Sequence, residues 1–219
     1  MLKAIIFDMD GLMVDTEPLS RQAWDAVLDP FGYALSDEVY WQMIGRRSEE
    51  SAQIAWSAYE LPVTAEELLE RKTAVFEARL AQGIPLMPGL KSLHAEIAQR
   101  QIPWAVATSS PRYYAETILA QLALADSCQA IAGGDEVRHG KPAPDIYLLA
   151  AERLGIAPAD CLALEDSVPG SQAAVAAGMV TVAVPDGDRA TADYPHVRYV
   201  FPSLHEVLAR LDELLSTSP

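Results

Sequence analysis

Short apolar runs alternate with longer amphipathic stretches along most of the chain. Continuous apolar runs of this length are typical of strands buried on both faces, as in a parallel sheet covered by helices. The predicted strands are Ala4–Phe7, Trp104–Ala107, Ala130–Ala132, Cys161–Leu164, Val180–Val184 and Tyr199–Phe201. The helices predicted around them are Gly89–Arg100, Arg112–Leu122, Asp145–Leu154, Val168–Ala177 and Ser203–Leu215. The pattern therefore predicts an α/β protein with an open, doubly wound parallel sheet.

One stretch breaks this alternation. Between about Thr16 and Met87 no strand is predicted, and helices are predicted at Pro18–Leu28, Asp37–Ile44, Glu49–Tyr59 and Ala65–Ala81. A helical domain inserted after the first strand is the simplest interpretation. We therefore expect an α/β core from residues 1–15 and 88–219, and an inserted helical cap from residues 16–87.

Local signals define several helix ends. Thr64 with Glu67, and Ser203 with Glu206, have the spacing of capping boxes at helix starts. Gly155 and Gly178 follow two predicted helices as C-terminal stops. These signals support the predicted boundaries.

Composition and charge narrow the classes of partner. The chain has 219 residues, of which 50% are hydrophobic, and its 31 acidic against 16 basic side chains give a formal charge of −15. Such a chain is long and apolar enough to bury a core, and an acidic surface disfavours nucleic acid and anionic membranes as partners. The longest apolar run, Ala173–Val184, is too short to span a bilayer, and Cys128 and Cys161 lack metal-site spacing. We expect a soluble cytoplasmic protein, either a monomer or a weak homodimer.

Acidic residues follow the first predicted strand directly. Asp8 and Asp10 stand at its carboxyl end, where open α/β sheets bind their ligands. Two carboxylates this close repel each other unless a cation joins them or one keeps its proton. Gly11 also permits a plain strand-end turn, so this pair alone leaves a structural interpretation open.

Three later segments bring further polar groups to the same edge of the predicted sheet. Hydroxyls follow the second strand at residues 108–110, Glu165 and Asp166 follow another strand, and Lys141 lies on a loop before a helix. Carboxylate oxygens with few histidines suit Mg²⁺, while a lysine and hydroxyls suit a phosphoryl group. Together these segments predict a site for a metal ion and a phosphate.

Each of these residues also has a structural alternative. Lys141 can be a solvated surface lysine, and Thr108 can cap the helix that follows Pro111. Glu165 and Asp166 can form an exposed turn or an N-cap. All the structural alternatives would have to hold at once for the site to be absent, so the combined pattern favours the site.

The same segments, in this order, resemble the four-motif signature of the haloacid dehalogenase superfamily. The motifs are Asp8-Met9-Asp10-Gly11 with Asp15-Thr16-Glu17, Thr108-Ser109-Ser110, Gly140-Lys141-Pro142, and Glu165-Asp166 with Gly170. The helical insertion resembles the branch that contains β-phosphoglucomutase and many small-molecule phosphatases. Segments such as Leu86–Gly89, His139–Pro142 and Ala177–Met179 through Val184–Gly187 resemble the pseudouridine 5′-phosphatase type. The resemblance implies a Rossmann-like core with a cap.

The resemblance also implies a role for each motif residue. Asp8 is expected to attack phosphorus and form an aspartyl-phosphate, and Asp10 to exchange protons with the leaving group and then with water. Asp8, Asp10 through its carbonyl, Asp166 and Glu165 are expected to hold Mg²⁺.

The remaining motif residues are expected to bind the phosphoryl group. Thr108 and Lys141 are expected to contact the transferred phosphoryl oxygens as charge shifts among them, with Ser109 adding its backbone N–H.

Substrate choice is expected to depend on the inserted helices. Arg46 and Arg47 lie on a predicted turn from which a guanidinium can reach a second anionic group or a sugar hydroxyl, although both can equally be solvated. Glu17 lies beside the expected hinge. Ser20 stands where β-phosphoglucomutase has a histidine thought to couple cap closure to catalysis, which favours a phosphatase over a mutase.

We therefore expect a Mg²⁺-dependent phosphatase that acts on a small phosphorylated metabolite, such as a sugar phosphate or a nucleoside monophosphate. One alternative is a hexose-phosphate mutase of the β-phosphoglucomutase kind. Another, from a different class, is a non-catalytic regulatory protein that binds phosphate. The second carboxylate, Asp10, argues against this last alternative because a sensor has no need of a proton donor.

Overall fold

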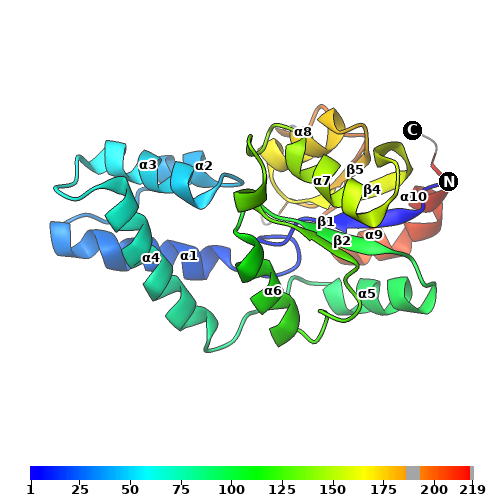
Figure 1. Cartoon of the computed structure of the whole chain (residues 1–219), viewed down its shortest axis with the longest axis horizontal. Coiled ribbons are helices and arrows are strands. Elements are labelled where there is room, and N and C mark those ends of the chain that lie inside the picture. Colours follow the sequence, from blue (N-terminus) through cyan, green and yellow to red (C-terminus); the bar gives the residue numbers. More distant parts are fainter. Residues whose placement is uncertain (186–192, 218–219) are drawn as a thin grey trace. The chain divides into compact units, whose positions relative to one another are not determined.

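The computed structural model describes residues 1–185 and 193–217, and within them six strands form one parallel sheet (Figure 1). The strands are β1 (Ala4–Phe7), β2 (Trp104–Ala107), β3 (Ala130–Ala132), β4 (Cys161–Glu165), β5 (Val180–Ala183) and β6 (Tyr199–Val200). Their order in the sheet is β3-β2-β1-β4-β5-β6, and each neighbouring pair is parallel. This arrangement confirms the predicted α/β architecture with a doubly wound sheet.

The strand order creates one reversal point. From β1 the chain adds β2 and β3 on one side, and then β4, β5 and β6 on the other, so the boundary lies between β1 and β4. Connections leave this boundary in opposite directions and open a crevice at the carboxyl ends of the strands. Asp8 directly follows β1 and Asp166 directly follows β4, so the fold carries two of the acidic motifs to this crevice.

Helices cover both faces of the sheet, with α7 and α8 on one face and α5 and α9 on the other (Figure 1). The α-helices that accompany the sheet are α5 (Leu90–Gln99), α6 (Arg112–Gln121), α7 (Asp145–Leu154), α8 (Val168–Ala176), α9 (Leu204–Ala209) and α10 (Leu211–Ser216). The β1 sequence Ala-Ile-Ile-Phe is buried throughout because the strand is central and both of its faces are covered. Alternate β1 residues, Ala4 and Ile6, pack into the core under α7 and α8.

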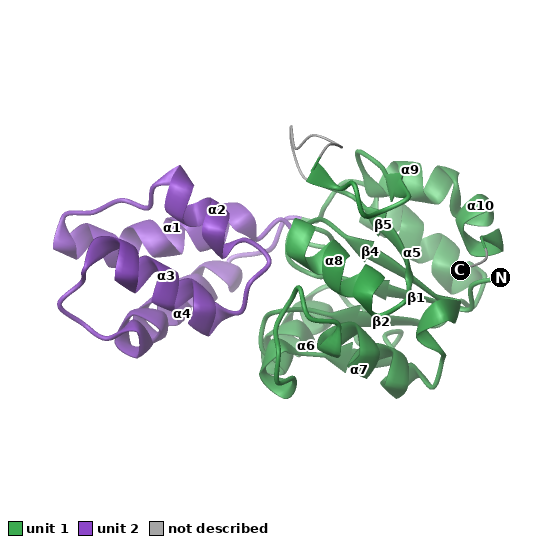
Figure 2. Ribbon diagram, turned by 90° about the horizontal axis from the view of Figure 1, so that it is seen from above, with its two compact units in different colours: residues 1–14, 86–219 green, residues 15–85 purple. Residues whose placement is uncertain are grey.

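The chain divides into two compact units (Figure 2). One unit comprises residues 1–14 and 86–219 and contains the sheet, and the other comprises residues 15–85. The second unit is helical, with α1 (Glu17–Leu28), α2 (Asp37–Met43), α3 (Ser48–Tyr59) and α4 (Ala65–Leu80). It has a core of its own around Trp24, Leu28, Tyr40 and Leu68.

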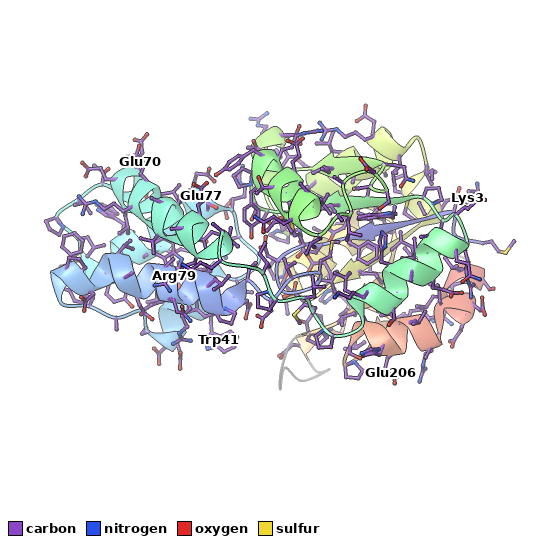
Figure 3. All side chains as sticks on the ribbon, turned by 90° about the horizontal axis from the view of Figure 1, so that it is seen from below. Lys3, Trp41, Glu70, Glu77, Arg79 and Glu206 are labelled. Carbon is purple, nitrogen blue, oxygen red and sulfur yellow. The ribbon has the colours of Figure 1, made fainter. Side chains whose placement is uncertain are left out.

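The helical unit has the amphipathic construction expected from its sequence. On α4, Leu68, Phe76 and Leu80 are buried, while Glu70 and Glu77 project from the helix surface (Figure 3). Thr64 begins this helix with the predicted capping box: its side chain accepts from the Glu67 N–H, and the Glu67 carboxylate accepts from the Thr64 N–H. None of the described helices has the length and hydropathy required to cross a membrane.

Two local predictions differ from the structure. Ser203 is the N-cap of α9, but its side chain makes no capping hydrogen bond, because the Glu206 N–H bonds instead to the Ser203 carbonyl at 3.1 Å. The predicted helix Ser203–Leu215 is divided into α9 and α10, which meet at Arg210 with ψ near 15°. Asp186 and Gly187 of the resemblance lie outside the described residues.

A surface ion-pair network connects the segment after β3, residues 133–136, with α7 and α6. The Arg153 guanidinium donates to both oxygens of Glu136, at 2.7 and 2.8 Å, and the Gly133 N–H donates to the same carboxylate at 2.9 Å. Arg112 approaches it at 3.5 Å. These contacts, led by the hydrogen bonds from Arg153, lower the pKa of Glu136 from 4.5 to about 2.

Replacing Glu136 with Gln should therefore lower the free energy of unfolding by about 1 kcal/mol near neutral pH, a value limited by solvent screening. Because the folded-state pKa is depressed, this contribution is present above the unfolded value of 4.5 and is lost as pH falls toward 2. Urea denaturation of the wild type and of Glu136→Gln, near neutral pH and at roughly pH 3, measures this contribution. At the lower pH about half of the contribution should be lost.

Glu116→Gln is the matched control. The Glu116 carboxylate receives one hydrogen bond from Arg112, at 2.8 Å, and its side chain is 52% exposed. Its replacement should cost less than half as much as that of Glu136. Equal losses from the two variants would contradict the role given to the bidentate pair.

Candidate active site

A buried lysine links two carboxylates at the boundary between β1 and β4. Lys141 Nζ lies 2.5 Å from Asp8 Oδ1 and 2.6 Å from Glu165 Oε1, and it also donates to the Ala107 carbonyl at 3.3 Å. The Lys141 side chain is only 1% exposed, so it is not the solvated surface lysine of the structural alternative. Three strand ends, those of β1, β2 and β4, therefore meet on one ammonium group.

Glu165 is fixed by hydrogen bonds at both oxygens. Oε1 accepts from Lys141 and from the Tyr147 hydroxyl at 3.3 Å, while Oε2 accepts from the Ser167 N–H at 2.7 Å and its hydroxyl at 2.9 Å. Each oxygen thus already accepts two hydrogen bonds, and a bond from Glu165 to a metal would replace one of them. The position of Glu165 chiefly serves to hold Lys141.

The start of α8 leaves room for this carboxylate. Ser167, not Glu165 or Asp166, is the N-cap, since its hydroxyl accepts from the Gly170 N–H at 3.1 Å. A Cβ at Gly170 would lie 1.5 Å from Glu165 Oε1, so only glycine permits the observed approach. This contact explains in physical terms why the fourth motif needs a glycine five residues after its glutamate.

Asp166 faces the loop that follows β1. A Cβ at Gly11 would lie 2.5 Å from Asp166 Oδ2, and Gly11 also has φ +85°, a conformation that favours glycine. The Asp166 backbone is held as well, because the Tyr194 hydroxyl donates to its carbonyl at 2.5 Å. Gly11 thus forms the bend expected from the sequence and brings the first and fourth motifs into contact.

Asp8, Glu165 and Asp166 form a buried acidic cluster that can hold a metal ion. One carboxylate oxygen from each lies within 4.8 Å of the others, and all three residues are buried. Three carboxylates against the one ammonium of Lys141 leave a net negative charge, which favours a further cation. Oxygen donors of this kind suit a hard divalent cation.

The pKa values of Asp8 and Lys141, the two partners of the central ion pair, are both raised, but for different reasons. Desolvation raises the pKa of Asp8 to about 8, and Glu165 and Asp10 add to this effect, although Lys141 opposes it. Desolvation also opposes the charge of Lys141, but Asp8 and Glu165 outweigh it and raise the lysine pKa above its usual value. An additional cation beside Asp8 would favour its ionised form, which is the form that can act as a nucleophile.

Asp10 lies in a different environment from Asp8. Its Oδ1 accepts from the Tyr114 hydroxyl at 2.9 Å, and its Oδ2 accepts from Ser110 at 2.9 Å and from Thr108 at 3.3 Å. Asp10 is half-buried and is surrounded by hydroxyls, whereas Asp8 is buried against an ammonium group. The two carboxylates of the first motif are thus held by different partners.

The second motif is packed closely against Gly134. The Thr108 hydroxyl accepts from the Ser110 N–H at 3.0 Å and does not cap α6, whose N-cap is Pro111. A Cβ at Gly134 would lie 2.1 Å from the Ser109 carbonyl oxygen, so that glycine permits the loop to approach. The Thr108 and Ser109 backbone is thereby fixed beside Lys141 and Asp10.

The three cap residues of interest lie in the helical unit. The Arg46 Nε donates to the Gln42 carbonyl at 2.8 Å, and the Arg47 Nε donates to Glu50 at 3.1 Å. The Glu17 carbonyl accepts from the Tyr40 hydroxyl at 3.4 Å. The structure describes these contacts within the unit, and any role in substrate binding stays a prediction.

The sequence did not predict the contributions of Tyr114, Tyr147 and Ser167 to the site. The two tyrosines occupy positions where helical periodicity predicts core packing, and both side chains are indeed buried. Ser167 carries a weak signal, since it directly precedes a predicted helix. Ser110 belongs to the predicted hydroxyl cluster, but its bond to Asp10 is not predicted by the sequence. Their partners could be found only once distant segments were placed side by side.

Comparison with known proteins agrees with this geometry. The model of the haloacid dehalogenase-like hydrolase family matches residues 2–178. One relative is a probable pseudouridine-5′-phosphatase of Drosophila melanogaster, which is 38% identical over 91% of this chain and 88% of that protein. Another is the fructose-1-phosphate phosphatase YqaB of Escherichia coli, which is 37% identical over 82% of this chain and 95% of that protein. CbbY from Rhodobacter sphaeroides, crystallised with phosphate, has a TM-score of 0.86 at 30% identity, covering 97% of this chain and all of that one.

Replacing Lys141 with Met should leave the Asp8 and Glu165 carboxylates buried without compensation. We expect a loss of about 3–5 kcal/mol in the free energy of unfolding together with loss of phosphate release. Adding Glu165→Gln removes one of the two charges and should recover part of the stability but none of the activity. Urea denaturation and a phosphate-release assay measure the two effects separately.

Lys91→Met serves as the control because Lys91 is an exposed lysine on α5. Its substitution should change neither stability nor activity appreciably. A double variant no more stable than Lys141→Met alone would contradict the electrostatic account.

Proposed function

Because the chain belongs to the haloacid dehalogenase-like hydrolase family and is a phosphoric monoester hydrolase, we propose that it hydrolyses a small phosphomonoester through an aspartyl-phosphate on Asp8. The family resemblance of the sequence motifs is thereby confirmed. The observation that carries the proposal is the buried Asp8 carboxylate, aligned by Lys141 beside the acidic cluster at the reversal point of the sheet.

The acidic cluster fits Mg²⁺ in its chemistry. Asp8 and Asp166 offer buried carboxylate oxygens, the Asp10 carbonyl is a further candidate ligand, and Glu165 would contribute only by exchanging one of its hydrogen bonds. Bound Mg²⁺ would offset the negative charge of the cluster and of the substrate phosphate. The surplus of buried negative charge over Lys141 is the feature of this chain that favours such an ion.

In the first displacement, an Asp8 oxygen forms a bond to phosphorus as the bond from phosphorus to the leaving oxygen breaks. The electron pair of the broken bond stays on the leaving oxygen, which takes a proton from the Asp10 carboxyl group. The products of this step are the free alcohol, an aspartyl-phosphate on Asp8 and an ionised Asp10.

In the second displacement, water attacks the phosphorus of the aspartyl-phosphate. Asp10 removes a proton from this water as the new bond to phosphorus forms, and the bond between phosphorus and the Asp8 oxygen breaks. Asp8 returns as a carboxylate and inorganic phosphate is released. One carboxyl group thus serves as acid and then as base, and the site ends as it began.

The phosphoryl oxygens are assigned to Lys141, the Thr108 hydroxyl and the Ser109 N–H. The Lys141 ammonium is already fixed by Asp8 and Glu165, so it provides a positive charge at a defined position without a search among side-chain conformers. The Thr108 hydroxyl can turn from Asp10 to a phosphoryl oxygen. Fixed donors of this kind stabilise the charge that develops during transfer.

A sugar phosphate or a nucleoside monophosphate is the proposed substrate class. Two similar proteins bear the names of a fructose-1-phosphate phosphatase and a probable pseudouridine-5′-phosphatase, and both names describe a phosphate on a sugar. Arg46, Arg47 and Glu17 of the helical unit are the proposed determinants of choice within this class. Ser20, in place of the histidine of β-phosphoglucomutase, favours hydrolysis over mutase chemistry.

Replacing Asp8 with Asn should lower phosphate release from p-nitrophenyl phosphate by about a thousandfold or more, since an amide cannot form the acyl phosphate. Mass spectrometry of the acid-quenched wild-type enzyme should show a phosphoryl adduct on Asp8 that the variant lacks. The exposed Asp126 provides the control, and Asp126→Asn should keep full activity. Undiminished turnover by Asp8→Asn would refute the mechanism.

Chelation with EDTA should abolish turnover across a panel of sugar phosphates and nucleoside monophosphates, and added Mg²⁺ should restore it. The same panel identifies the preferred substrate. Conversion of β-glucose 1-phosphate to the 6-phosphate without phosphate release would instead establish the mutase. Failure to release phosphate from any member of the panel would favour the non-catalytic alternative.

A further inference from the structure

The Asp10 carboxylate is held from two sides by hydroxyl groups. Ser110 and Thr108, from the loop after β2, donate to Oδ2, and Tyr114, from the first turn of α6, donates to Oδ1 at 2.9 Å. These bonds join residues about a hundred positions apart in the chain. They fix the plane of the carboxyl group as well as its position, because both oxygens are engaged.

Tyr114 is placed for this contact by the helix on which it lies. Pro111 is the N-cap of α6, and Tyr114 follows in the first turn with only 6% of its surface exposed. Its neighbour Tyr113 projects outward with 52% exposed. The two adjacent tyrosines are identical in chemistry but differ in burial, and Tyr114 donates a hydrogen bond to Asp10.

We propose that Tyr114 is a positioning residue that orients the Asp10 carboxyl group for proton transfer, and that Ser110 assists it at the other oxygen. This inference rests on the proposed function, in which Asp10 protonates the leaving oxygen. The Thr108 hydroxyl is assigned to the phosphoryl group, so Tyr114 and Ser110 are the hydroxyls that keep hold of Asp10 when substrate is bound. Each carboxyl oxygen retains capacity for a proton beyond these hydrogen bonds.

Orientation matters because the proton moves along a defined line. As the bond from phosphorus to the leaving oxygen breaks, the Asp10 proton passes to that oxygen and Asp10 becomes a carboxylate. A carboxyl group that rotates freely spends little time aligned with the leaving oxygen. Alkyl phosphates need this proton, whereas the p-nitrophenolate ion leaves readily without one.

The test compares kcat/KM for two substrates in Tyr114→Phe. For the alkyl phosphate hydrolysed fastest in the substrate panel, kcat/KM should fall by about tenfold or more. For p-nitrophenyl phosphate it should fall by less than about threefold, since its departure needs no general acid. Ser110→Ala should show the same difference between substrates, and Tyr113→Phe, at the exposed neighbour, should show no loss on either.

A double-mutant cycle separates positioning from general structural damage. In the Asp10→Asn background, Tyr114→Phe should change the rate for the alkyl phosphate by no more than about twofold, because the group it orients is already gone. A purely structural role would lower activity in both backgrounds and on both substrates equally. Equal losses of that kind, no loss, or a gain in kcat/KM for the alkyl phosphate would each overturn the proposal.

The Asp10→Asn variant distinguishes failure of the positioning role of Tyr114 from failure of the proposed function. If Asp10→Asn itself affects both substrates equally, then Asp10 is not the proton donor and the mechanism fails at that residue. If Asp10→Asn shows the difference and neither Tyr114→Phe nor Ser110→Ala does, only the inference about positioning fails. Thermal denaturation of each variant shows whether it is folded under the assay conditions.

Discussion

The contact of Lys141 with Asp8 and Glu165 is the interaction on which the rest of the site depends. An ammonium group buried to this degree is stable only with negative partners at hydrogen-bond distance, and here it has two, at 2.5 and 2.6 Å. The partners follow β1 and end β4, the two strands that flank the reversal point of the sheet. The topology of the core therefore makes this ion pair possible, and the ion pair in turn sets where Asp8 stands.

Close packing around this ion pair is possible because several positions carry no side chain. Gly170 leaves space for the Glu165 carboxylate, Gly11 for Asp166 and Gly134 for the Ser109 carbonyl. In each case a Cβ would approach a polar atom of the site to 2.5 Å or less. These glycines thus set the distances within the site as directly as the charged residues do, and at Gly11 the backbone conformation adds a second requirement.

Much of the architecture follows from sequence pattern because its causes are local. The β1, β2 and β3 bounds agree with the apolar runs, and the capping box at Thr64 forms as its spacing predicts. The pattern fails at Ser203, where a backbone bond replaces the side-chain cap. The contacts of Tyr114 and Tyr147 could not be predicted from the sequence, because helical periodicity describes which face is buried and not which distant oxygen a hydroxyl will meet.

Contacts with distant segments, rather than local sequence, also explain how the two aspartates of one short motif acquire different roles. Strand geometry brings Asp8 and Asp10 to the same edge of the sheet, but it does not distinguish them. Partners from other segments do so. Asp8 is buried against the Lys141 ammonium, near Glu165 and Asp166, while Asp10 is half-buried among hydroxyl groups from residues 108–114. Burial raises the pKa of Asp8 to about 8, so the ionised form that attacks phosphorus is favoured only when positive charge beside it outweighs desolvation. Asp10 is held by neutral hydroxyl donors, and we assign it the proton exchange. The division of labour within the motif thus arises from tertiary structure.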